Sequence, residues 1–149
     1  MTNRNLTRLI PTATLAVLMT ALSAAPTLAK ITTRDENLAN PRGWPAVAGM
    51  DVNSVLEMAK TAPVADQAGP AQPYCDQDAK VHQTLQQDFG EELVSGGAND
   101  TQLWGSTVMG TWTVVLKRAD ATSCVIASGV GYADGANPRV FFVSAGLNG

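Results

Sequence analysis

The clearest hydrophobic pattern in the chain is an alternation of apolar and polar residues over positions 111–117. Trp112, Val114 and Leu116 share one face of an extended strand there, and mostly polar residues share the other. Such alternation is typical of a half-buried β-strand. A short polar connection follows, and the apolar-rich run 123–129 then completes an antiparallel hairpin. We expect this hairpin to lie at the centre of the fold.

The expected register of the hairpin follows from the need to keep the large apolar groups on one face. Pairing Lys117 with Ser123 achieves this and leaves Thr113 and Lys117 facing outward. The remaining pairs are then expected to be Leu116 with Cys124, Val114 with Ile126, and Trp112 with Ser128.

A second pattern has the period of a helix. Val81, Leu85 and Phe89 recur every four residues, Asp76 is a candidate N-cap, and Gly90 is placed to end the helix. We expect this apolar stripe to cover the apolar face of the hairpin.

Weaker patterns complete the expected domain. Residues 101–106 and 139–144 are predicted to be further strands, whereas 91–100 is predicted to be a polar connection. The predicted fold class is therefore α+β. One helix packs on a small antiparallel sheet of three to four strands, within a domain spanning 75–149.

The N-terminus has the features of a secretory signal peptide. Arg4 and Arg8 precede the apolar run Leu9–Leu22, and small residues at Thr27 and Ala29 suit a cut before Lys30. Such a run is too short to be a transmembrane helix. We therefore expect 1–29 to be removed, the protein to be periplasmic or secreted, and no stable membrane insertion after cleavage.

Residues 30–74 carry few regular signals. Prolines are frequent and large apolar residues are scarce, so most of this stretch is predicted to be an extended or disordered arm. The exception is a short helix near 51–60, with apolar residues on one face and Asp51 as its cap. A helix this short needs a surface to dock on, either in its own domain or on another protein.

The charge of the chain limits the classes of partner that it can bind, and its cysteines indicate a disulfide. The net charge is −3, and loss of Arg4 and Arg8 makes it more negative by two. No basic cluster appears, which argues against nucleic acid as a partner and leaves an envelope protein as a candidate. Cys75 and Cys124 are the two cysteines, and in an exported chain they are most simply one disulfide.

Reactive groups are few. His82 is the single histidine, so neither a catalytic triad nor a histidine-rich metal site can be assembled, and no cofactor or metal is predicted. Glu91 and Glu92 are adjacent carboxylates that we expect to be solvated, although paired carboxylates serve glycoside hydrolysis. No catalytic residue is therefore assigned.

Tryptophans are the candidates for a binding surface, since an exposed indole can anchor a ligand or a partner. Trp112 lies on the expected core face. Trp44 and Trp104 remain open between packing and binding, and both are kept as a possible binding surface.

The order of these features resembles a group of small exported alphaproteobacterial proteins. The resemblance covers 75–130, and its most specific parts are Gly110-Thr111-Trp112-Thr113 and the Cys-x-x-Ala-Ser-Gly strand that begins at Cys124. It implies export and paired cysteines, and it supplies no catalytic residue. The 30–74 arm and the tail after Gly131 depart from the pattern.

Three functions fit these observations. A small periplasmic or secreted non-enzymatic binding or accessory protein is preferred, because the domain is small and no reactive constellation is apparent. The alternatives are an inhibitor that inserts its arm or a loop into an envelope hydrolase, and a cell-wall hydrolase that uses carboxylates such as Glu91.

Overall fold

The structure is a computed structural model that describes residues 41–147. The predicted signal peptide, 1–29, and the first part of the predicted arm, 30–40, lie outside the described residues. No helix within 41–147 has the length and apolar character that crossing a membrane requires.

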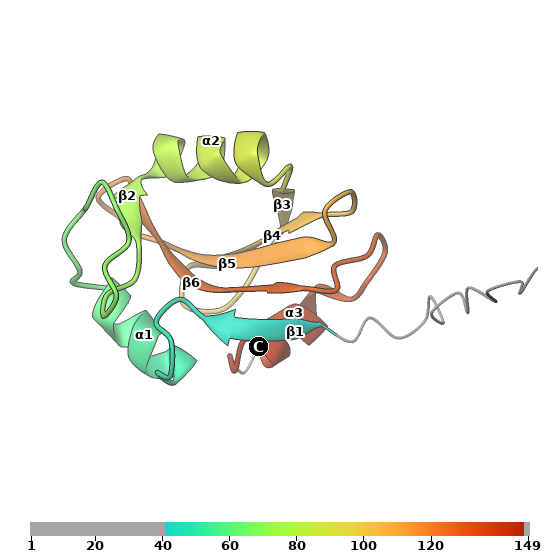
Figure 1. The fold of residues 1–149 in the computed structure, drawn as a ribbon, viewed down its shortest axis with the longest axis horizontal. Coiled ribbons are helices and arrows are strands. Elements are labelled where there is room, and N and C mark those ends of the chain that lie inside the picture. The colour runs from blue at the N-terminus through green and yellow to red at the C-terminus, as the bar shows by residue number, and fades with distance from the viewer. Residues whose placement is uncertain (1–40, 148–149) are drawn as a thin grey trace, which may run out of the picture. The chain divides into compact units, whose positions relative to one another are not determined.

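The described residues form three layers, with a six-stranded antiparallel sheet between helices (Figure 1). Helices α1 and α3 lie on one face of the sheet, and α2 lies on the other. The strands run in the order β1-β6-β5-β4-β3, and β2 pairs with β6 as well. The elements are β1 (Arg42–Pro45), α1 (Val52–Ala59), β2 (Cys75–Gln77), α2 (Asp78–Asp88), β3 (Glu92–Gly96), β4 (Thr101–Ser106), β5 (Thr111–Lys117), β6 (Thr122–Val130) and α3 (Pro138–Ser144).

The α+β class is confirmed, but the sheet has more strands than the three to four expected. β3 occupies part of the predicted polar connection, where a register irregularity between Leu93 and Ser95 breaks the alternation that would reveal a strand. β1 and β2 are too short to produce a periodic pattern, and both depend on pairing with β6.

The central hairpin is confirmed, and its register is correct only near the turn. Lys117 pairs with Ser123 and Leu116 with Cys124, as predicted. Beyond that point the ladder shifts, because Ile126 is an extra residue that brings Ala127 opposite Val114. The predicted pairs Val114–Ile126 and Trp112–Ser128 are therefore wrong, and Trp112 pairs with Gly129 instead.

The predicted position of α2 is wrong. Val81 and Leu85 pack against Trp104 and Val115, which lie on the sheet face opposite to the predicted one. The apolar face formed by Trp112, Val114, Leu116 and Ile126 belongs to a separate core with α1 and α3. Both faces of β5 are buried, so its alternation cannot tell which helix covers which face.

Two further details of that helix differ from expectation. Phe89, predicted to be buried, is 45% exposed, and Thr113, predicted to face outward, is buried. α2 starts at Asp78 rather than near Asp76, because Cys75–Gln77 is already engaged as β2. Gly90 ends the helix with a φ of +59°, which a glycine adopts without strain.

Much of the predicted arm is part of the fold. β1 pairs with the end of β6, and α1 contributes four buried side chains to the core. The predicted short helix is confirmed, including the cap in which Asp51 accepts a hydrogen bond from the Ser54 N–H at 3.2 Å. Its docking surface is its own domain.

The predicted strand at 139–144 is wrong, because these residues form α3. Asn137 caps the helix by accepting a hydrogen bond from the Arg139 N–H at 3.0 Å, and Pro138 takes the first helical position. Proline is favoured there because its fixed φ suits the helix and its missing N–H is not needed. Phe141 and Phe142 are buried against the sheet.

The predicted disulfide is confirmed. Cys75 of β2 lies directly opposite Cys124 of β6, and their sulfur atoms are bonded. Both residues are fully buried in the core that includes α1.

Candidate functional site

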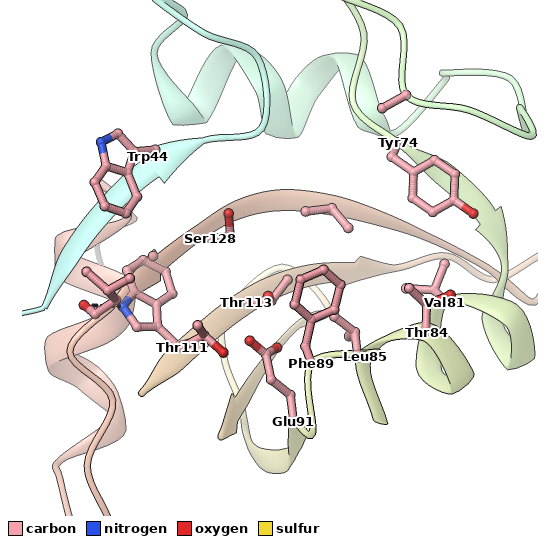
Figure 2. Close-up of a pocket in the computed structure, with 15 residues that line it drawn as sticks. Trp44, Tyr74, Val81, Thr84, Leu85, Phe89, Glu91, Thr111, Thr113 and Ser128 are labelled. Atoms are coloured by element: carbon pink, nitrogen blue, oxygen red, sulfur yellow. Dashed lines mark hydrogen bonds between the residues drawn. The ribbon is translucent and has the colours of Figure 1, made fainter. Parts of the chain in front are cut away.

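A pocket of about 440 Å³ opens on the sheet face that carries α2 (Figure 2). Its size lies within the range of small-molecule sites. Side chains from β1, α2, β5, β6 and the segment before β2 surround it, and most of them are apolar. The lining comprises Trp44, Ala68, Tyr74, Val81, Thr84, Leu85, Phe89, Glu91, Thr111, Trp112, Thr113, Val125, Ser128, Gly129 and Val130.

The pocket exists because α2 covers only part of this face. Val81 and Leu85 of α2 seal the sheet over Val115 and Trp104. Beyond the end of the helix, the face remains accessible, and Trp44 on β1 borders it on the far side. Trp44 is 52% exposed and Phe89 is 45% exposed. The pocket therefore has aromatic groups at its mouth.

Trp112 closes one part of the pocket and is enclosed by its neighbours. Its ring is fully buried, and its indole N–H donates to the carbonyl of Val130 at 3.2 Å. A Cβ on Gly43 or Gly129 would come within 2.7 Å of this ring. Two glycines on adjacent strands thus leave the space that the indole fills.

Glu91 is the charged residue in this lining. Only 1% of its surface is exposed. Gly90 turns the chain at the end of α2, and the Glu91 N–H then donates to the carbonyl of Leu85 at 2.8 Å. This turn brings the carboxyl beside the Thr111 and Thr113 side chains of β5 (Figure 2).

The carboxyl is not fully satisfied by its surroundings. Burial raises the pKa of Glu91, and the neighbouring hydroxyls of Thr113 and Thr111 offset part of that rise. Within the described residues, Oε2 of Glu91 has no hydrogen-bond partner, and Oγ1 of Thr111 accepts no hydrogen bond although its hydroxyl faces the carboxyl. A buried polar group left without a partner costs about 1–3 kcal/mol, so this arrangement does not serve stability.

The structure separates the two tryptophans proposed as a binding surface. Trp44 lies at the pocket mouth. Trp104 is 3% exposed and packs at a tilt against the half-buried ring of His82, with the ring centroids 4.6 Å apart. Trp104 is therefore a packing residue, and the expectation that it contributes to a surface is wrong.

The expectation that Glu91 is solvated is also wrong, although its neighbour Glu92 is exposed. The adjacent pair of carboxylates gave no sign of this difference, because it depends on the turn at Gly90 and on the strands that surround Glu91. The disulfide lies elsewhere, since Cys75 and Cys124 belong to the core on the opposite face. Across 41–147, no cluster of three or more histidine, cysteine, aspartate or glutamate residues is arranged to hold a metal ion.

The raised pKa of Glu91 predicts a pH-dependent cost to stability. Because the folded protein holds this proton more tightly than the unfolded chain, stability declines as pH rises from the ordinary value of 4.5 through the raised pKa. Glu91→Gln removes the titration. We expect the variant to be more stable than the parent at pH 7, by on the order of 1 kcal/mol, and to lose this advantage below pH 4.5.

Urea unfolding midpoints of both proteins across this pH range measure the effect. Glu92→Gln is the matched control, and because that side chain is exposed we expect it to change stability by less than about 0.5 kcal/mol throughout. Parallel pH profiles for the parent and Glu91→Gln would show that the carboxyl is not buried in solution.

The site is thus an apolar pocket with one unsatisfied carboxyl and an aromatic mouth. The resemblance of residues 75–130 to exported alphaproteobacterial proteins remains an expectation drawn from their motifs. Comparison with known protein families, curated proteins and solved structures finds no match for this chain.

Proposed function

We propose that this chain is a small exported, non-enzymatic binding protein that takes a small apolar molecule into the pocket between α2 and β1. The observation that carries the proposal is the pocket itself, since a lining of Val81, Leu85, Val125 and aromatic rings matches the surface of such a molecule. Burying that surface is what drives apolar ligands into sites of this kind.

The proposed location in the periplasm or outside the cell rests on the N-terminal sequence. The disulfide between Cys75 and Cys124 supports it, because such bonds persist in oxidising compartments and are rare in reducing ones. A carrier or sensor of an apolar molecule would also have a use in an aqueous compartment, where such molecules are poorly soluble.

The test is the binding of N-phenyl-1-naphthylamine, a dye whose fluorescence rises in apolar surroundings. The oxidised protein recovered from exporting cells is titrated alongside Ser128→Trp, which places an indole in the pocket at an exposed position on β6. We expect saturable binding by the parent and a loss of about 10-fold or more in the variant, equivalent to about 1.4 kcal/mol.

The matched control is Ser54→Trp, which adds the same group at an exposed position on α1, across the sheet from the pocket. It should bind the dye as the parent does. Equal binding by the parent and Ser128→Trp would refute the pocket as the site, and non-saturable fluorescence would refute binding.

One observation favours hydrolysis as a second candidate. A carboxyl with a raised pKa in an apolar pocket has the character of a general acid, and Glu91 has both features. Glycoside hydrolysis uses two carboxyl groups, and the described lining supplies one. Turnover of a cell-wall glycan that disappears in Glu91→Gln would establish hydrolysis in place of simple binding.

A further inference from the structure

The chemistry around Glu91 specifies the polar end of the ligand. Among the described residues that line the pocket, Glu91 and Tyr74 are the two whose side chains can titrate. The Tyr74 hydroxyl is already engaged, because it donates to Asp76 at 2.8 Å. The carboxyl therefore has no cation from this lining beside it.

Several lysine and arginine side chains among the described residues form ion pairs, and these pairs lie outside the pocket. Each of them contacts a carboxylate that does not line the pocket, in the pairs Lys60–Glu57, Lys80–Asp76, Lys80–Asp66, Lys117–Asp78 and Arg118–Asp120. A buried carboxylate is stabilised by a partner of opposite charge. The described lining supplies no such partner at Glu91, and a cationic ligand would supply one.

Two side-chain oxygen atoms that can accept hydrogen bonds lie in this part of the pocket. Oε2 of Glu91 is buried and without a partner in the described residues, and the buried Oγ1 of Thr111, whose hydroxyl faces the Glu91 carboxyl, accepts no hydrogen bond there; both residues line the pocket. A primary ammonium group has three N–H donors and can serve two acceptors at once. A quaternary ammonium has none, and a hydroxyl has one.

Aromatic rings line the rest of the pocket. Trp44 and Phe89 border the mouth, and Tyr74 lies at the other end of the pocket (Figure 2). Such rings add apolar surface for the hydrocarbon part of a ligand. A carboxylate ligand would face the Glu91 carboxyl and be repelled by its charged form.

We propose that the ligand is an amphiphilic primary amine, with its ammonium group bound by Glu91 Oε2 and Thr111 Oγ1 and its hydrocarbon part along Val81, Leu85 and Val125. This inference rests on the proposed function and adds the class of ligand. Glu91 is then the residue that determines specificity, and the stability lost by burying it is recovered when the amine binds.

Four probes with the same chain test this proposal by displacement of the naphthylamine dye at pH 7: octylamine, 1-octanol, octanoate and octyltrimethylammonium. A hydrogen bond to a charged group contributes about 1.5–3 kcal/mol. We therefore expect octylamine to bind on the order of 10- to 100-fold more tightly than 1-octanol. Octanoate and octyltrimethylammonium should both bind more weakly than octylamine.

Two variants assign the preference to the proposed atoms. Glu91→Gln, which keeps the size of the side chain, should lower the affinity for octylamine by about 10-fold or more and leave that for 1-octanol within about 3-fold. Thr111→Val should weaken octylamine binding to a smaller extent, also with little effect on 1-octanol.

The outcomes separate the two proposals. If 1-octanol and octylamine bind equally, or if Glu91→Gln keeps the preference for octylamine, the amine inference is wrong and the apolar pocket stands. If octyltrimethylammonium matches octylamine, charge alone governs selection and the N–H contacts are wrong. If no probe displaces the dye while the dye still binds in Ser128→Trp, the proposed function fails as well.

Discussion

Replacing Trp112 with alanine is expected to lower the free energy of unfolding by about 3–5 kcal/mol, the range for removing a large aromatic side chain from a core. The indole is fully buried, and its ring centroid lies 5.8 Å from that of Phe141 on α3. Gly43 and Gly129 approach the ring so closely that the backbone would have to move to fill the space it leaves. Chemical denaturation followed by circular dichroism measures the loss.

Trp44→Ala is the matched control for this prediction. It removes the same side chain from a strand of the same sheet, but the residue is 52% exposed, so we expect a loss below about 1 kcal/mol. Dye binding should weaken in this control while stability is retained. Similar losses of stability in both variants would contradict the assignment of one tryptophan to the core and the other to the pocket mouth.

Reducing the disulfide is expected to cost about 4 kcal/mol, the chain-entropy value for closing a loop of this length. Cys75 and Cys124 are 49 residues apart in sequence, and the loop between them contains α2, β3, β4 and β5. Urea midpoints measured with and without reductant give the effect. For a domain of this size, the loss is a large fraction of the total stability.

The double variant Cys75→Ala/Cys124→Ala is the control for reductant acting elsewhere. Its midpoint should be low and should not respond to reductant. An unchanged midpoint of the parent on complete reduction, verified by alkylation of both thiols, would show that the bond contributes nothing to the folded state.

Local patterns predicted the elements that are defined by their own residues. The β5 strand, the α1 helix with its Asp51 cap and the end of α2 at Gly90 all follow from periodicity and terminal residues. The disulfide was also predictable, because two cysteines leave one intramolecular pairing. In each case the information lies within a few positions of the element.

Features that depend on distant partners were not predictable from such patterns. The bulge at Ile126 changes the register without altering the apolar character of β6. The choice of face for α2 depends on α1, which competes for the sheet from a stretch that looked like an arm. At 139–144, the apolar run suits a strand as well as a helix, and the Asn137 cap with Pro138 at the first helical position decides for the helix.

The candidate site was predicted only in part, for the same reason. Trp44 could be proposed because an exposed indole can anchor a ligand or a partner. The burial of Glu91 could not, since it results from the joint positions of α2, β5 and β1. Composition showed that a carboxylate was present, and only the tertiary structure showed that it lacks a partner.

The pairing of β1 with the end of β6 also determines when the pocket can come into existence. Arg42 lies opposite Val130 and Trp44 opposite Ser128. The two strands that border the site on this side are therefore neighbours in the sheet but are separated in sequence by most of the domain. A chain leaves the ribosome with its N-terminus first. Trp44 therefore emerges long before β6, the strand with which β1 pairs. A nascent or partly emerged chain therefore lacks the pocket, which is complete only when β6, the last strand of the sheet in sequence, has paired with β1.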